Sequence, residues 1–239
     1  MKLVLASQSP RRRELLEWIQ KDFIVQASSA EEVIPPGATP YEAVELLARV
    51  KAQAVAKDYP DCVVIGADTV VALDGQIMGK PKDRADCVRM LSALSGREHE
   101  VYTGVALVVN GQTESFYERT AVRFLPLTEE EINWYADLDE PYDKAGAYGI
   151  QGYGSLLVEG ICGDYFNVMG LPVAALNRLQ LLRLVLQQAQ GAGKGRSLAI
   201  LDREMRLNTG CLVKICNFLP LSKNSKIPVE IAPFSGYNI

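Results

Sequence analysis

Residues 62–69 read Cys-Val-Val-Ile-Gly-Ala-Asp-Thr, an apolar run that closes on a carboxylate and a hydroxyl. Such a run between polar segments is typical of a strand buried on both faces. We predict that this strand is central and that Asp68 ends it, because open α/β sheets bind ligands at the carboxyl ends of their strands. The segment therefore predicts both an α/β fold and the place of a ligand.

The segments on both sides alternate between strand and helix patterns. Ser9 is the expected N-cap of a first helix, with Pro10 at its first position, and Asn110-Gly111 is a strong hairpin signal. Strands are expected at 2–6, 23–26, 62–65, 99–109 and 112–125, with two more within 155–168, and helices from Ser9 and at 39–57, 83–94, 128–140 and 172–188. This pattern predicts a mixed α/β fold.

Bulk composition restricts the classes of protein and partner. The 239 residues are 48% hydrophobic, enough for one large core or two small ones. A net charge of −4 argues against a broad nucleic-acid or anionic-membrane surface. No apolar run approaches the roughly 20 residues that span a bilayer, and the start turns polar at Ser7 before a signal-peptide core can form. We expect a cytoplasmic protein with no nucleic-acid or membrane partner, and a homodimer stays open.

Cysteine and histidine usage limits the metal chemistry. The five cysteines include no CxxC pair, so neither a disulfide framework nor a thiolate zinc site is indicated, and we expect buried thiols. The single histidine, His99, excludes two-histidine metal motifs and is expected in the core or sheet rather than in catalysis. Any metal is expected to be bound by carboxylates.

Three arginines occupy the first turn of the first helix, where the helix dipole disfavours cations. Arg11 and Arg12 lie beside free helix N–H groups and the hydroxyls of Ser7 and Ser9, so we predict a phosphate site there. Arg13 faces away in a helical projection and is expected in solvent.

Charged residues elsewhere can complete an anion site. Lys51 lies on the apolar stripe of its helix, and it either has a buried partner or extends past the stripe to solvent. Asp68 is either a cap for the following turn or a metal ligand and base. We favour the second role, because Lys51, Lys80 and either Glu31 or Glu32 supply the other charges of such a site.

Two glycine-containing loops suit close approach to a ligand, although each can be a plain turn. They are residues 79–82, which contain Lys80, and residues 143–154, whose glycine content is too high for a regular element.

The composition changes near the end of the chain. Residues 191–196 read Gly-Ala-Gly-Lys-Gly-Arg, but position 188 is Gln where a phosphate loop needs Gly, and Gly195 stands where it needs Ser or Thr. We predict one domain over 1–188, followed by a tail over 189–239 that begins with a flexible linker and has no assigned role.

Taken together, these motifs resemble the Maf (septum-formation) family of nucleotide pyrophosphatases over residues 2–188. The resemblance is carried by Ala6 to Arg12, Glu31-Glu32, Lys51, Gly66 to Thr69, Gly79-Lys80-Pro81, Lys144 to Gly152 and Gly170-Leu171-Pro172. The loop ending Tyr-Gly-Ile-Gln-Gly is similar to the branch that acts on dTTP and UTP. The tail has no counterpart in the family pattern.

The resemblance implies an elongated mixed sheet flanked by helices, with an active-site cleft between two lobes. It implies Asp68 as proton acceptor, with Glu32 and Asp68 at a divalent metal, Mg²⁺ or Mn²⁺. Specificity positions would be Arg11, Thr69 and Gln151, and positions around the phosphates would be Arg12, Lys51 and Lys80.

The expected reaction is hydrolysis of a nucleoside triphosphate at the α-phosphorus, giving the monophosphate and pyrophosphate. Such a reaction needs a metal, cations for the departing pyrophosphate and a carboxylate that deprotonates water, but no nucleophilic side chain. Two alternatives stay open: a nucleotide-binding regulator of cell division without turnover, and a phosphatase that releases orthophosphate from the γ-position.

Overall fold

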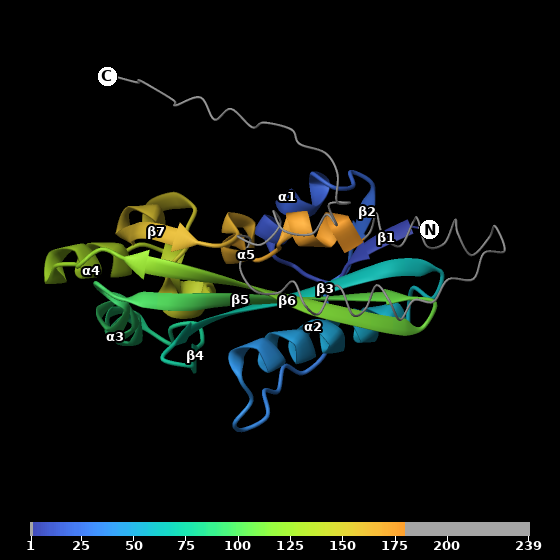
Figure 1. Cartoon of the computed structure of the whole chain (residues 1–239), viewed down its shortest axis with the longest axis horizontal. Coiled ribbons are helices and arrows are strands. Elements are labelled where there is room, and N and C mark those ends of the chain that lie inside the picture. Colours follow the sequence, from blue (N-terminus) through green and yellow to red (C-terminus); the bar gives the residue numbers. More distant parts are fainter. Residues whose placement is uncertain (1, 180–239) are drawn as a thin grey trace, which may run out of the picture.

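The protein is built on one elongated mixed sheet (Figure 1). The structure, a computed structural model, describes residues 2–179, and within them the sheet has seven strands in the order β2-β1-β3-β5-β6-β7, with β4 beside β3. The strands are β1 Lys2–Leu5, β2 Phe23–Val25, β3 Cys62–Leu73, β4 Gln76–Met78, β5 Glu98–Val109, β6 Gln112–Phe124 and β7 Val158–Cys162. β1 pairs parallel with β2 and β3, and the other pairs are antiparallel.

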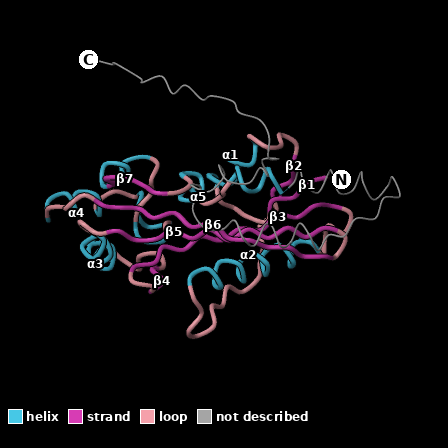
Figure 2. The backbone as a smooth tube through the Cα atoms, viewed as in Figure 1, coloured by secondary structure: helices cyan, strands magenta, loops and turns pink. Residues whose placement is uncertain are grey.

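Helices cover both faces of the sheet (Figure 2). They are α1 Pro10–Glu17, α2 Pro40–Ala56, α3 Arg84–Leu94, α4 Glu129–Ala136 and α5 Tyr165–Met169, with 3-10 turns η1 Glu140–Asp143, η2 Ala145–Ala147 and η3 Gly152–Leu157. Helix α2 lies on one face, and α1 and α5 lie on the other (Figure 1). The expected Ser9 cap is present, since its hydroxyl accepts from the Arg12 N–H, and the helix expected to start at 128 begins with a capping box between Thr128 and Glu131.

Two large apolar clusters form the cores of two lobes. One lies around α3, α4 and the adjoining strand ends, and includes Leu91, Phe124 and Tyr135. The other lies around α1, β1 and α5, and includes Leu15 and Ile65. The predicted fold class, an elongated mixed sheet with flanking helices and two lobes, is confirmed.

The predicted end of the central strand was wrong. β3 continues from Cys62 to Leu73 instead of stopping at Asp68, because β5 pairs with it throughout this stretch, with Asp68 opposite Gly104. Asp68 therefore lies in the middle of a long strand rather than at its carboxyl end.

The predictions for the segment after residue 155 need a second correction. Only one of the two expected strands forms, β7, because Gly163 turns the chain at φ +133° and Asp164 caps α5 by accepting from the Phe166 N–H. Residues 173–179 are helical, as expected. The rest of the helix expected at 172–188 and the tail 189–239 lie outside the described residues.

The expectation of buried thiols holds only in part. Cys87 is buried, Cys62 is half-buried, and Cys162 is exposed at the end of β7, which lies at the edge of the sheet and pairs with β6. Cys211 and Cys216 lie outside the described residues. None of the described helices is long and apolar enough to cross a bilayer.

Candidate active site

Lys51 and Asp68 form an ion pair at the centre of the sheet. Lys51 Nζ lies 2.5 Å from Asp68 Oδ1 and 3.0 Å from Glu32 Oε1. The side chains of Lys51 and Asp68 are each only 12% exposed, so the lysine does not extend to solvent. The question left open by the sequence is therefore answered, since Lys51 has an acidic partner.

Two glycines allow α2 to come close enough for this contact. A Cβ at Gly66 on β3 would lie 2.4 Å from the Ala48 carbonyl oxygen, and one at Gly104 on β5 would lie 2.3 Å from the Val44 carbonyl oxygen. Real side chains do not tolerate such distances. The backbone of α2 thus rests directly on β3 and β5, and Lys51, one turn after Ala48, reaches Asp68.

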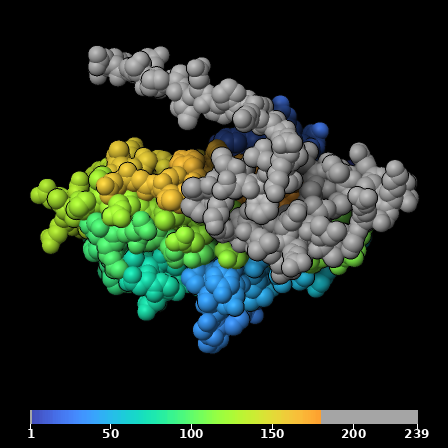
Figure 3. Space-filling view, in the orientation of Figure 1, coloured from blue at the N-terminus to red at the C-terminus, as the bar shows by residue number. Residues whose placement is uncertain are grey.

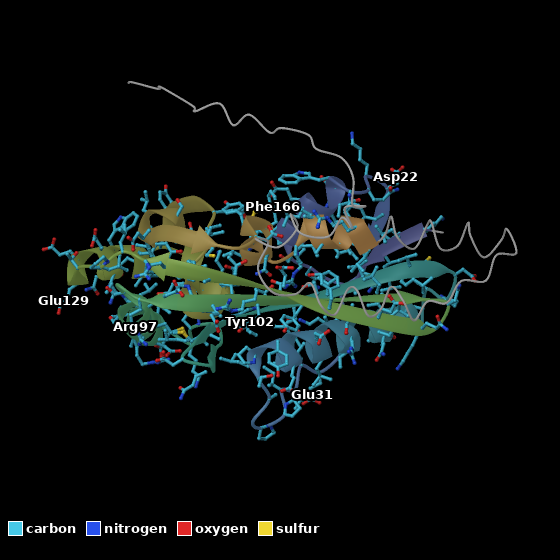
Figure 4. The ribbon with its side chains drawn as sticks, in the orientation of Figure 1. Asp22, Glu31, Arg97, Tyr102, Glu129 and Phe166 are labelled. Atoms are coloured by element: carbon cyan, nitrogen blue, oxygen red, sulfur yellow. The ribbon has the colours of Figure 1, made fainter. Side chains whose placement is uncertain are left out.

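The segment between β2 and α2 brings a second carboxylate to the same place. This segment protrudes at the lower edge of the view (Figure 3), and Figure 4 labels Glu31 on it. Glu31 and Glu32 are both exposed, but Glu32 pairs with Lys51. Of the two acidic residues that the sequence could not separate, Glu32 is the one that joins the cluster.

Three hydrogen bonds fix the Arg12 side chain, two of them to residues far away in sequence. Its Nε donates to the Gly170 carbonyl at 2.8 Å, its Nη2 to Thr69 Oγ1 at 2.9 Å and its Nη1 to Ser7 Oγ at 3.3 Å. Burial lowers the pKa of the Arg12 guanidinium from its ordinary value, and the nearby charge of Asp68 opposes that change. A partly desolvated cation at the start of a helix favours an anionic ligand.

The other two arginines differ from Arg12. Arg11 Nη1 lies 3.5 Å from Asp143 Oδ2, which links α1 to the glycine-rich loop. Arg13 is exposed and pairs with Glu17 on its own helix, as its helical projection predicted.

Thr69, which is half-buried, belongs to a chain of hydrogen-bonded polar groups that the sequence did not indicate. Thr103 Oγ1 donates its only proton to the Asn167 backbone carbonyl at 2.9 Å. In its 2.9 Å contact with Thr69 Oγ1 it is therefore the acceptor, and the Thr69 hydroxyl is the donor. The Thr69 oxygen then accepts from Arg12. Thr103 and Asn167 thereby orient the arginine through Thr69, and single polar residues within apolar strands gave no signal of this role.

The predicted residues surround one cleft of about 360 Å³, within the size range of small-molecule sites. Its lining includes Ser9, Arg11, Arg12, Glu32, Lys51, Asp68, Thr69, Lys80 and Gln151. Ser7 does not line the cleft but binds Arg12. Lys80 is exposed and Gln151 is half-buried. The sequence did not single out Asp143, which lines the cleft and accepts from Lys144 Nζ at 2.5 Å.

His99 lies apart from this chemistry, as expected. Its side chain is buried in β5, and its Nε2 lies 2.8 Å from the Tyr148 hydroxyl. Burial lowers the pKa of His99 to about 4, so the ring is neutral at pH 7.

Comparison with known sequences decides the family. Residues 2–183 match the profile of Maf, described as Maf-like protein. The chain belongs to the Maf family. This Maf chain is 53% identical over 177 residues to a protein of Bacillus cytotoxicus named dTTP/UTP pyrophosphatase, covering 74% of this chain and 93% of that protein. A protein of the same name from Bacillus mycoides is 52% identical with the same coverage. The family predicted from the motifs is confirmed.

Among solved structures, the Maf chain is similar to the Staphylococcus aureus Ham1 protein. That likeness has a TM-score of 0.39 and 20% identity, and it covers 52% of this chain and 72% of the other.

Proposed function

We propose that this Maf chain hydrolyses dTTP and UTP to the monophosphate and pyrophosphate. The observation that carries the proposal is the Lys51–Asp68 pair, which lies in one cleft with Glu32 and Arg12. The relatives named dTTP/UTP pyrophosphatase share half of their residues with this chain over 93% of their length. They confirm the nucleotide pyrophosphatase activity predicted from the sequence.

Asp68 is the proposed proton acceptor. Its Oδ1 is bound to Lys51, whereas no hydrogen bond within the described residues reaches Oδ2. This oxygen can orient a water molecule and take its proton. The water oxygen forms a bond to the α-phosphorus, the bond to the oxygen that bridges the α- and β-phosphorus breaks, and pyrophosphate leaves.

Cations at the cleft are proposed to bind the phosphates. Arg12 is held at the start of α1 beside the N–H groups of its first turn, and Lys80 lies exposed at the rim. Positive charge placed where the leaving group develops negative charge lowers the barrier of phosphoryl transfer. We assign Arg12 and Lys80 to the departing pyrophosphate, and Ser7 and Ser9 to the positioning of this phosphate site.

We propose that a divalent metal, Mg²⁺ or Mn²⁺, enters with the substrate. Glu32 and Asp68 both approach Lys51 Nζ, so both carboxylates face one position that already attracts a cation. The described residues contain no group of three or more acidic, histidine or cysteine side chains suited to a metal. This donor set fits Mg²⁺, which proteins commonly bind through one or two carboxylates plus substrate phosphates. When bound, the ion would offset the charge of the triphosphate.

Gln151 is the proposed base-recognition residue. Uracil and thymine present an N3–H donor between carbonyl acceptors, whereas cytosine presents an acceptor at N3 and an exocyclic donor. One side-chain amide offers both a donor and an acceptor. Gln151 is half-buried in the cleft, and a pocket matched to the first pattern leaves groups unpaired against the second. Arg11 and Thr69 are proposed to assist in specificity.

A panel of triphosphates with Mg²⁺, assayed for pyrophosphate and orthophosphate, tests the proposal. We expect pyrophosphate from dTTP and UTP, less from CTP and least from purine triphosphates. Binding without multiple turnover would favour the regulator alternative, and orthophosphate as first product would favour the γ-phosphatase. A cytoplasmic location and a homodimer stay predictions.

A further inference from the structure

The loop that carries Gln151 is bound to one carboxylate outside the cleft. Glu140 Oε1 accepts from the Tyr135 hydroxyl at 2.9 Å and from the Gly154 N–H at 3.0 Å, and Oε2 accepts from the Tyr153 N–H at 3.0 Å. Glu140 is half-buried and does not line the cleft. Its carboxylate therefore fixes the backbone that follows Gln151, although Glu140 itself does not lie in the cleft where the substrate is proposed to bind.

Tyr135 extends the same support to the backbone before Gln151. Its hydroxyl accepts from the Gly149 N–H at 3.2 Å while it donates to Glu140. The ring is fully buried, and burial raises the pKa of Tyr135 above its ordinary value, so the phenol keeps its proton. Both sides of Gln151 thus depend on Glu140, one directly and the other through Tyr135.

The backbone on the two sides of Gln151 is in close contact. A Cβ at Gly154 would lie 2.2 Å from the Gly149 carbonyl oxygen, so the two ends of the loop are in contact. Gly152 has φ +74°, and a Cβ there would lie 2.6 Å from Glu140 Oε2. The backbone around Gln151 is therefore shaped by the carboxylate and leaves no room for side chains at these glycines.

We propose that Glu140 is a positioning residue that fixes the Gln151 amide for recognition of uracil and thymine. The inference rests on the proposed function, since it assumes that Gln151 reads the base. Substitution by glutamine would replace one of the two carboxylate oxygens by an NH₂ group, so that either the Tyr153 N–H or the Gly154 N–H would lose its acceptor. The loop would then lose its fixed position, and base discrimination would fall while the phosphate site remained intact.

The test compares Glu140→Gln with Glu131→Gln in the full chain. Glu131 is a matched control, because its carboxylate also accepts from a backbone N–H and a hydroxyl, those of Thr128 at 2.8 and 3.0 Å, and it does not line the cleft. Steady-state kcat and KM are measured for UTP and CTP. Dissociation constants of UMP and CMP are measured by calorimetry, and thermal unfolding reports stability.

We expect Glu140→Gln to raise KM for UTP and Kd for UMP by about 10-fold, the size of effect of one lost hydrogen bond to a charged group. KM for CTP and Kd for CMP should change little, and so should kcat for CTP. Glu131→Gln should lower stability without changing the UTP to CTP ratio. Glu140→Asp keeps the charge and should restore part of the preference.

An equal loss for UTP and CTP in Glu140→Gln, or an unchanged preference, would overturn the inference. So would equal binding of UMP and CMP by the wild-type protein. A wild-type protein that releases no pyrophosphate from UTP contradicts the proposed function instead, and the binding of UMP against CMP still decides the role of Glu140.

Discussion

Lys51 Nζ and Asp68 Oδ1 lie 2.5 Å apart, with both side chains 12% exposed. One member comes from the middle of α2 and the other from the middle of β3. Removing one partner of a largely buried pair leaves a charge with little solvation, which costs more than the loss of an exposed pair. The pair therefore contributes to the contact between α2 and the sheet as well as to the proposed chemistry.

Asp68→Asn should reduce turnover by about 100-fold or more, because the amide cannot accept a proton. The change is nearly isosteric, so circular dichroism should remain that of the native fold. Asp74→Asn is the control, since Asp74 pairs with Arg97 at a hairpin turn and is 71% exposed. A near-normal rate in Asp68→Asn would rule out the role of proton acceptor.

Gln151→Ala should lower kcat/KM selectively for dTTP and UTP, because the amide that matches their base edges is removed. Gln53→Ala, which removes an exposed amide bonded to Thr113, should leave every rate unchanged. If Gln151 only braces the glycine loop, rates for all triphosphates would instead fall evenly. Initial-rate measurements on UTP, dTTP, CTP and GTP separate the two results.

Gly104→Ala should destabilise the protein by about 1–3 kcal/mol or more, the usual cost of overpacking. The added methyl would push α2 away from β5 and take Lys51 from Asp68, so activity should fall too. Gly160→Ala on β7 is the matched control, since a Cβ there meets nothing within 4 Å. Urea unfolding of both variants measures the difference, and equal midpoints would contradict the close approach.

His99 should make stability depend on pH between about 4 and 6.5. Its pKa is about 4 in the folded protein and 6.5 in the unfolded chain, so the unfolded state binds more protons in this window. The contribution of neutral His99 to stability is then fully present at pH values above its pKa in the unfolded chain. It is lost as the pH falls towards its pKa in the folded protein.

The free energy of unfolding is expected to be about 3 kcal/mol lower at pH 4 than at pH 7, because each unit of difference between the folded and unfolded pKa is worth about 1.4 kcal/mol. Denaturant unfolding at several pH values, compared with His99→Gln, isolates this contribution. Identical pH profiles for the wild type and the variant would show that His99 is not the group responsible.

Truncation after Gln190 should leave kcat and KM essentially unchanged. Among residues 2–179, which the structure describes, those that line the cleft all lie upstream of the truncation, the last of them being Gly170. A truncated chain that folds but has no activity would show that the tail, which lies outside the described residues, takes part in the site.

The sequence by itself determined the local elements. Cap residues such as Ser9 and Thr128, and the turn at Asn110-Gly111, act within a few residues, so helix starts and hairpins could be predicted correctly. It also determined the residue types of the site, because a cation such as Arg12 in the first turn of a helix is unfavourable without an anion.

Tertiary structure decided what depends on distant partners. Pairing with β5 extended β3 past Asp68, and packing of α2 on Gly66 and Gly104 gave Lys51 its partner. The Glu140 contacts to the Gln151 loop also needed the folded chain, since a glutamate before a proline gives no sign of the backbone N–H groups it will meet. Periodicity and capping report interactions along the chain, whereas these contacts come from sheet pairing and packing between segments far apart in sequence.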